Sequence, residues 1–182
     1  MKKYIALLRG INVGGKNKIS MAELKRGFEE LGFLDVVTYI NSGNVIFNSD
    51  IQANHELSQA IESMIVDKFK INTPVAIVEV TELSAVYKNA PIWWNTSDKE
   101  IYDNAIFVIY PTSVEDVYKA VGEAIPEYEK TAHYNNVIFW SFQLKTYSKA
   151  RWSKIVSSKV NNSVTIRTAN TVRKLLEIAN KK

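Results

Sequence analysis

One short segment concentrates the residue types that bind anions. Residues 8–18 read Leu-Arg-Gly-Ile-Asn-Val-Gly-Gly-Lys-Asn-Lys, so three of the seven glycines lie beside three basic side chains. Glycine lets backbone N–H groups converge on one point, and arginine or lysine adds positive charge. We therefore expect a small anionic ligand, bearing phosphate or carboxylate, to bind here. The alternative is a long loop whose glycines make turns and whose Arg9 pairs with a local carboxylate. The predicted ligand-binding residues of this loop are Arg9, Gly10, Asn12, Gly14, Gly15, Lys16, Asn17 and Lys18.

The same segment departs from a nucleotide-binding P-loop at its last position. The P-loop pattern G-x-x-x-x-G-K-[ST] uses a hydroxyl to ligate Mg²⁺, and Asn17 stands in that place. A hairpin is also predicted to follow, whereas P-loop proteins continue with parallel strands. His55 and His133 have no neighbours at metal-ligand spacing, so we predict no metal site and no cofactor. Whether the protein is an enzyme stays open.

Two further segments supply candidate ligand-binding residues. Ser42 and Asn44 lie in a turn, Asn41-Ser42-Gly43-Asn44, whose tip could join the site of the loop. The alternative is a simple hairpin turn that needs a positive φ at Gly43. Arg167 stands at the end of a predicted strand, where it can bind the ligand or form an ion pair.

Charge is distributed unevenly along the chain. The net charge is +4, with a balance of +4 over residues 1–30, −9 over residues 31–144 and +9 over residues 145–182. This asymmetry suggests an anionic partner, although basic ends can also face the acidic middle within the fold. A nucleic-acid-binding module with basic ends is an alternative, not favoured because no strand carries an RNP-type aromatic motif. A protein interaction module without a small ligand is the second alternative.

Other totals bound the class of protein. The absence of cysteine excludes disulfides and thiolate metal sites and fits a reducing cytoplasm. The apolar run after Lys2 and Lys3 is too short for a signal peptide, and no run has the length of a membrane helix. We therefore expect a cytoplasmic protein without a membrane partner, and the oligomeric state stays open.

The spacing of apolar residues predicts the same order of elements twice. In the first half we expect strands at 4–8, 36–40, 45–47 and 74–80. The helices between them follow the Ser20-x-x-Glu23 capping pattern and the apolar residues around Leu57 and Ile61. In the second half we expect strands at 104–110, 128–134, 137–142 and 164–167, with helices from near Ser113 and over 148–158. A further helix ends each half.

A β-α-β-β-α-β order is the ferredoxin-like split arrangement, an antiparallel sheet with two helices on one face. The predicted fold is therefore α+β, with two tandem ferredoxin-like subdomains that arose by internal duplication. Asn-Val-Ile-Phe occurs at 44–47 and again at 136–139, which supports a repeat. We predict a first subdomain at 1–90, a linker at 91–102 and a second subdomain at 103–182. The second half has only Pro111-Thr112-Ser113 where the first has its long loop, so the loop belongs to one copy alone.

Several of these residues together resemble a known family. The N-terminal set is Ala6-Leu7-Leu8-Arg9-Gly10-Ile11-Asn12-Val13-Gly14-Gly15-Lys16 with Met21, Leu24, Leu31-Gly32, Thr38-Tyr39 and Ser42-Gly43-Asn44-Val45. The C-terminal set is Val164-Thr165-Ile166-Arg167, Asn170-Thr171-Val172 and Lys174-Leu175-Leu176. Both are similar to the bacterial domain-of-unknown-function 1697 family. The resemblance implies a two-subdomain α+β fold and a cytosolic bacterial protein, and it carries no established activity.

Overall fold

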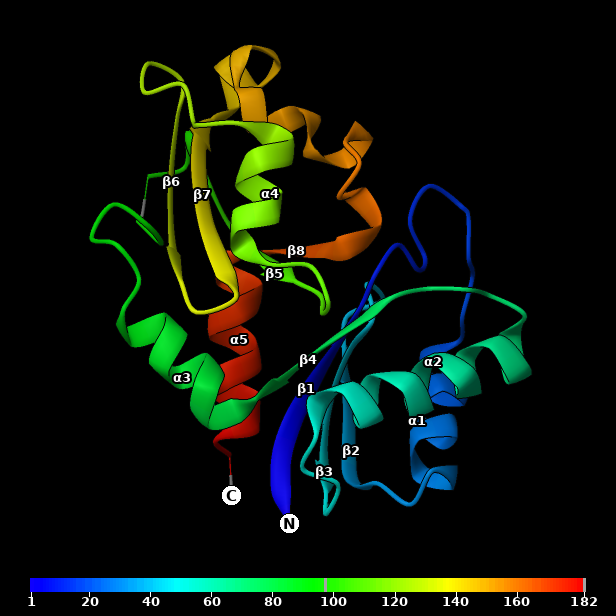
Figure 1. Ribbon diagram of the computed structural model, residues 1–182. Helices are drawn as coiled ribbons and strands as arrows, with labels where there is room; N and C mark the ends of the chain where they lie inside the picture. Colours follow the sequence, from blue (N-terminus) through cyan, green and yellow to red (C-terminus); the bar gives the residue numbers. More distant parts are fainter. Residues whose placement is uncertain (97, 182) are drawn as a thin grey trace. The chain divides into compact units, whose positions relative to one another are not determined.

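The chain folds into two units, each built on its own four-stranded sheet. The computed structural model describes residues 1–96 and 98–181 (Figure 1). Contacts divide the chain into Met1–Leu83 with Leu175–Lys182, and Ser84–Lys174. Both sheets are antiparallel and carry helices, which confirms the predicted α+β class. The predicted bounds 1–90, 91–102 and 103–182 follow the order of elements instead of these contacts, and they stay a prediction.

The first unit has the predicted β-α-β-β-α-β order. Its strands follow the order β2-β3-β1-β4 across the sheet. The elements are β1 (Lys2–Leu8), α1 (Met21–Glu30), β2 (Leu34–Tyr39), β3 (Asn44–Ser49), α2 (Asn54–Phe69) and β4 (Val75–Glu79), followed by α3 (Val80–Lys88), whose residues are divided between the units. In Figure 1 α1 and α2 lie beside one another on the sheet.

Alternation along the strands explains how these helices are held. Successive strand residues point to opposite faces, so Tyr4, Ala6 and Leu8 lie on one face of β1. All three belong to a buried cluster with Leu24 of α1 and Ile61 of α2. The helices therefore follow from apolar residues at helical spacing that meet one face of the sheet.

The second unit repeats the strand order as β6-β7-β5-β8. Its elements are β5 (Ile101–Val108), α4 (Val114–Val121), β6 (Glu129–Tyr134), β7 (Val137–Gln143), β8 (Val164–Thr168) and α5 (Ala169–Ala179). α4 begins with a capping box in which Ser113 and Asp116 bond each other's backbone. The residues of α5 are divided between the two units at Leu175.

The α-helix expected over 148–158 is replaced by 3₁₀ turns. Three short 3₁₀ helices, η1 (Leu144–Lys149), η2 (Arg151–Ser157) and η3 (Asn161–Ser163), connect β7 to β8. Serine hydroxyls bond backbone carbonyls three residues back: Ser153 to Ala150 O at 2.6 Å and Ser157 to Lys154 O at 3.0 Å. Such local bonds compete with regular α-helical bonding, which the apolar spacing alone did not reveal.

The strand registers show which residues of the two sheets correspond. Tyr4 pairs with Phe47 and with Glu79, while Asn104 pairs with Trp140 and with Thr168. At the other end, Leu8 N–H donates to Gly43 O at 2.8 Å and Val108 N–H donates to Asn136 O at 3.0 Å. Residues 4–9 therefore correspond to residues 104–109.

This correspondence corrects the tetrapeptide match. Aligning 44–47 with 136–139 equates Phe47 with Phe139, but the register equates Phe47 with Trp140. A shift of one residue turns every side chain to the opposite face. Phe47 belongs to the buried cluster of the first unit, and Trp140 belongs to the buried cluster of the second unit. Phe139 instead packs against Trp94, with the two ring centroids 5.0 Å apart. The repeat thus lies in the topology, and the matching letters are out of register.

Candidate functional site

The basic loop (residues 9–18) is held at its root by the residues that precede the two strands flanking β1. Arg9 N–H donates to Pro74 O at 3.1 Å, and the Thr73 hydroxyl donates to Arg9 O. On the other side, Leu8 N–H reaches the carbonyl of Gly43 in the β2–β3 turn. The loop therefore leaves the sheet from a fixed position.

The tip of the loop is a two-residue turn. Val13 and Lys16 form an isolated bridge, with Lys16 N–H donating to Val13 O at 3.0 Å. Gly14 and Gly15 between them have φ values of +57° and +75°, as a type I′ turn requires. Gly14 and Gly15 therefore form the turn, and the turn explains why glycines occur at these two positions, both of which were predicted to bind an anion.

Asn12 fastens the loop to its surroundings. Its amide nitrogen donates to Ile19 O and to Asn41 O, both at 2.9 Å, and its amide oxygen accepts from Ile19 N–H at 2.8 Å. Both amide hydrogens are thus engaged within the protein. Asn12 was expected to bind ligand, and its geometry gives it a positioning role in the loop.

A second asparagine closes the base of the loop. Asn17 Nδ2 donates to Gly10 O at 3.1 Å, while Asn12 N–H donates to Asn17 O at 3.0 Å. Asn17 has a φ of +48° and Gly10 one of +63°, so both adopt the left-handed conformation. The asparagine that differs from the P-loop pattern therefore holds the loop's backbone in place.

A shallow groove of about 510 Å³ lies between the loop and the start of α1. Ser20 caps α1, and its hydroxyl accepts from Glu23 N–H at 3.4 Å, as the capping pattern predicts. Lys18 is exposed at the groove, and no carboxylate lines it within the described part of the chain. The lining residues are Asn12, Gly15, Lys18, Ile19, Ser20, Met21 and Asn41.

This groove gathers part of the predicted set. Asn12, Gly15 and Lys18 line it, whereas Arg9, Gly10, Gly14, Lys16 and Asn17 belong to the loop without lining the groove. Asn41 and Met21 were not predicted as site residues. In the sequence, Asn41 is marked only by its place in a predicted turn, and Met21 only by its place after a predicted helix cap. Neither pattern indicates which side chains the fold brings together.

The turn after β2 lies against the root of the loop. A Cβ atom added to Gly43, whose φ is +77°, would approach Leu8 Cβ and Ile11 Cδ1 to 2.8 Å, so glycine is required there. The Asn44 amide donates to Tyr39 O at 3.0 Å and to the Ser42 hydroxyl at 3.1 Å. Ser42 and Asn44 therefore shape this turn, and a direct ligand contact for either stays a prediction.

The two arginines of the predicted set lie in different units. Arg9 is half-buried, and burial lowers the pKa of its guanidinium. Arg167 is buried on β8, where its guanidinium donates to the Thr165 hydroxyl at 2.8 Å and to Ile166 O at 2.9 Å. Burial lowers the pKa of Arg167 to about 10, so it is protonated at neutral pH. A shared role with the loop stays a prediction.

No group of three or more His, Cys, Asp or Glu side chains that could hold a metal ion occurs among residues 1–96 and 98–181. Within the same residues, every helix is too short or too polar to cross a bilayer.

Comparison with known proteins identifies one family and a similar structure. A family model described as "Protein of unknown function (DUF1697)" matches residues 1–139, a range that includes the whole basic loop. Among solved structures, the conserved bacterial protein SP0830 from Streptococcus pneumoniae matches with a TM-score of 0.86 and 30% identity. The match covers 98% of this chain and 99% of that chain. None of the curated proteins matches.

Proposed function

The chain belongs to the DUF1697 family of proteins of unknown function, and we propose that it binds a small phosphate- or carboxylate-bearing anion in the groove beside the basic loop. The observation that carries this proposal is the composition of the groove wall. It combines the Lys18 cation with the start of a ten-residue helix and contains no carboxylate among its described residues.

Electrostatics favours an anion at this position. The N-terminus of a helix carries a partial positive charge and free N–H groups, which stabilise phosphate or carboxylate. Ser20 caps only one of the first N–H groups of α1, that of Glu23. Lys16 is exposed on the turn and adds a second cation to the loop, outside the lining of the groove. An anion in the groove would meet the ammonium group of Lys18 and no repelling side chain in the lining.

Rigidity of the loop also favours binding. The root is bonded on both sides, the tip is a tight turn, and Asn12 joins the loop to Ile19 and Asn41. A loop that is already ordered loses little conformational entropy when a ligand binds.

Thermal unfolding with added phosphate, adenosine monophosphate and citrate tests the proposal. A ligand at a hundred times its Kd stabilises the folded state by about 2.7 kcal/mol, which raises the midpoint measurably. We expect Lys18→Ala and Lys16→Ala to reduce that rise. Lys99→Ala, which removes an exposed lysine of the second unit, is the control and should keep it.

Two results would contradict anion binding at the loop. One is a stabilising anion whose effect is the same in Lys18→Ala, Lys16→Ala and the unaltered protein. The other is stabilisation by a single-stranded oligonucleotide alone, with an affinity that falls steeply with salt, which would favour the nucleic-acid alternative.

A further inference from the structure

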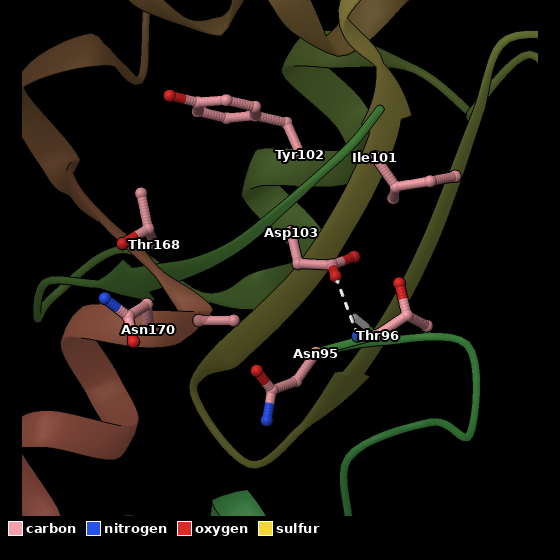
Figure 2. A pocket seen from close by; sticks show the side chains of 8 residues that line it. Asn95, Thr96, Ile101, Tyr102, Asp103, Thr168 and Asn170 are labelled. Carbon is pink, nitrogen blue, oxygen red and sulfur yellow. Dashed lines mark hydrogen bonds between the residues drawn. The ribbon is translucent and has the colours of Figure 1, made fainter. Parts of the chain in front are cut away.

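A second pocket, of about 270 Å³, lies in the second unit where β8 ends and α5 begins (Figure 2). The pocket exists because β5 extends beyond β8. Strand β8 pairs with residues 104–108 of β5, so residues 101–103 have no paired strand on the β8 side. Asn95 and Thr96 from the preceding segment form one wall, and Thr168 and Asn170 form another. This pocket shares no residue with the groove of the basic loop.

Asp103 places a buried carboxylate in this pocket. Its residue is 9% exposed, one oxygen accepts from Thr96 N–H at 3.1 Å, and the other accepts from the Ser141 hydroxyl. Each carboxylate oxygen has two lone pairs, so each retains room for another donor. No cationic side chain forms an ion pair with Asp103 in the part of the chain that the structure describes. Buried carboxylates are rarely left without either a cationic partner or a full set of hydrogen-bond donors, and among the described residues Asp103 has only two donors for its four lone pairs.

The corresponding position in the first unit carries a cation. By strand register, Asp103 corresponds to Lys3. The ammonium of Lys3 donates to the backbone oxygen of Ala179 at 2.7 Å. The first unit thus has an ammonium at this position, whereas the second unit has a carboxylate and a pocket.

We propose that the pocket of Asp103 binds a small molecule that carries a primary ammonium group. The ammonium donates to the carboxylate of Asp103 and to the amide oxygen of Asn95, whose nitrogen is already engaged with the Tyr87 hydroxyl at 2.7 Å. On the other wall, the oxygen of Asn170 accepts from Arg173 at 2.7 Å, which leaves its amide hydrogens for an acceptor atom on the ligand.

The size of the pocket limits the ligand further. Its volume lies just below the ~300–1,000 Å³ of pockets that hold drug-sized molecules. A ligand of amino-alcohol or diamine size, with one ammonium and a second polar group, satisfies both walls. Because a charged partner strengthens each hydrogen bond to the carboxylate, the ammonium should bind better than a neutral hydroxyl of equal size.

The test is a titration of the isotopically labelled protein followed by amide chemical shifts. Ethanolamine and 1,4-diaminobutane are the probes, and ethylene glycol and 1,4-butanediol are their neutral counterparts. We expect shifts at Thr96, Asp103 and Asn170 with the amines in the millimolar range and much smaller shifts with the diols. Asp103→Asn should weaken amine binding by about tenfold or more, since a hydrogen bond to a charged group is lost.

Two further variants keep the test decisive. Asn170→Lys alters an exposed residue, so it should fold even where Asp103→Asn does not, and its ammonium should compete with the ligand for Asp103. Glu100→Gln removes an exposed carboxylate outside the lining and should leave binding unchanged. The proposal is overturned if the amines cause no shifts at the pocket, if the diols cause equal shifts, or if Asn170→Lys binds the amines as the unaltered protein does.

Discussion

Glu129 is a buried carboxylate that accepts four N–H groups. One oxygen accepts from Ile125 N–H at 3.1 Å and Arg151 N–H at 2.8 Å. The other accepts from the Trp140 indole at 3.0 Å and from Trp152 N–H at 3.1 Å. The residue is 3% exposed. Through these bonds β6 holds the neighbouring strand β7 and the 3₁₀ helix η2, which stands where the first unit has α2. We predict that the second unit depends on this carboxylate for its stability.

Glu129→Gln preserves the shape of the side chain and changes two of the four bonds. The amide oxygen can still accept two N–H groups, but the NH₂ group must then face two donors. Each bond to a charged acceptor contributes about 1.5–3 kcal/mol, and the two donors would be left buried without a partner. Removal of the buried charge offsets part of this loss. We therefore expect the free energy of unfolding to fall by about 3–5 kcal/mol, against typical totals of ~5–15 kcal/mol.

Urea unfolding followed by tryptophan fluorescence measures this change. All four tryptophans, at positions 93, 94, 140 and 152, lie in the second unit, so the signal reports on the unit that contains Glu129. Glu123→Gln removes an exposed carboxylate of the same unit and should change the free energy by no more than about 0.5 kcal/mol. A Glu129→Gln variant as stable as this control, with the same dependence on urea, would refute the four-bond description.

Three further predictions concern the first unit. Tyr4→Phe removes a buried hydroxyl without a hydrogen-bond partner among the described residues and should raise the free energy of unfolding by about 1 kcal/mol in urea unfolding. Tyr118→Phe, in the other unit, removes a hydroxyl that is hydrogen-bonded and should lower the free energy of unfolding. A lower free energy of unfolding in both variants would contradict the description of the Tyr4 hydroxyl as lacking a partner. Gly43→Ala should lower the free energy by about 2–4 kcal/mol, since a positive φ and a close contact both oppose the added Cβ, whereas Gly32→Ala, with a φ of +82° but open space, should lower it by about 1–2 kcal/mol. Equal losses would show that the close contact at Gly43 has no effect. Burial raises the pKa of Glu62, so at this side chain the folded state binds a proton more readily than the unfolded state does. Protonation of Glu62 therefore stabilises the folded state, and this stabilisation is lost as the pH rises through the pKa of the folded state. Glu62→Gln should therefore be more stable than the unaltered protein at pH 7 and equal to it at low pH, and thermal melts that differ equally at both pH values would contradict this.

Most of the fold could be predicted from the sequence because each element has apolar residues at the spacing of its own geometry. Along β1, for example, Tyr4, Ala6 and Leu8 face one cluster, and Leu24 and Phe28 of α1 share a helix face that meets it. The prediction of an α-helix over 148–158 was wrong for a reason outside apolar spacing. Serine hydroxyls there bond nearby carbonyls, and the carboxylate of Glu129, distant in sequence, takes the N–H groups of Arg151 and Trp152.

The candidate sites were less predictable than the fold, since a site depends on which segments meet. The composition of residues 9–18 indicated an anion-binding loop, but it did not show that Asn12 is fully engaged or that Asn41 lines the groove. The pocket of Asp103 left no comparable signal. Its residues come from three separate segments, and none of these segments has an unusual composition.

Both proposed sites lie where the two sheets, alike in topology, differ in detail. Between β1 and the Ser20 cap, the first unit inserts the basic loop, and the second unit bridges the same interval with residues 109–112 alone. At the opposite end of the corresponding strands, the first unit has Lys3, whose ammonium donates to Ala179 O, and the second unit has Asp103 in a pocket. Strand order cannot explain either difference, because it is the same in both units. What distinguishes the units is local, so variants at the exposed residues Lys18 and Asn170 test the proposed sites directly and leave the shared framework intact.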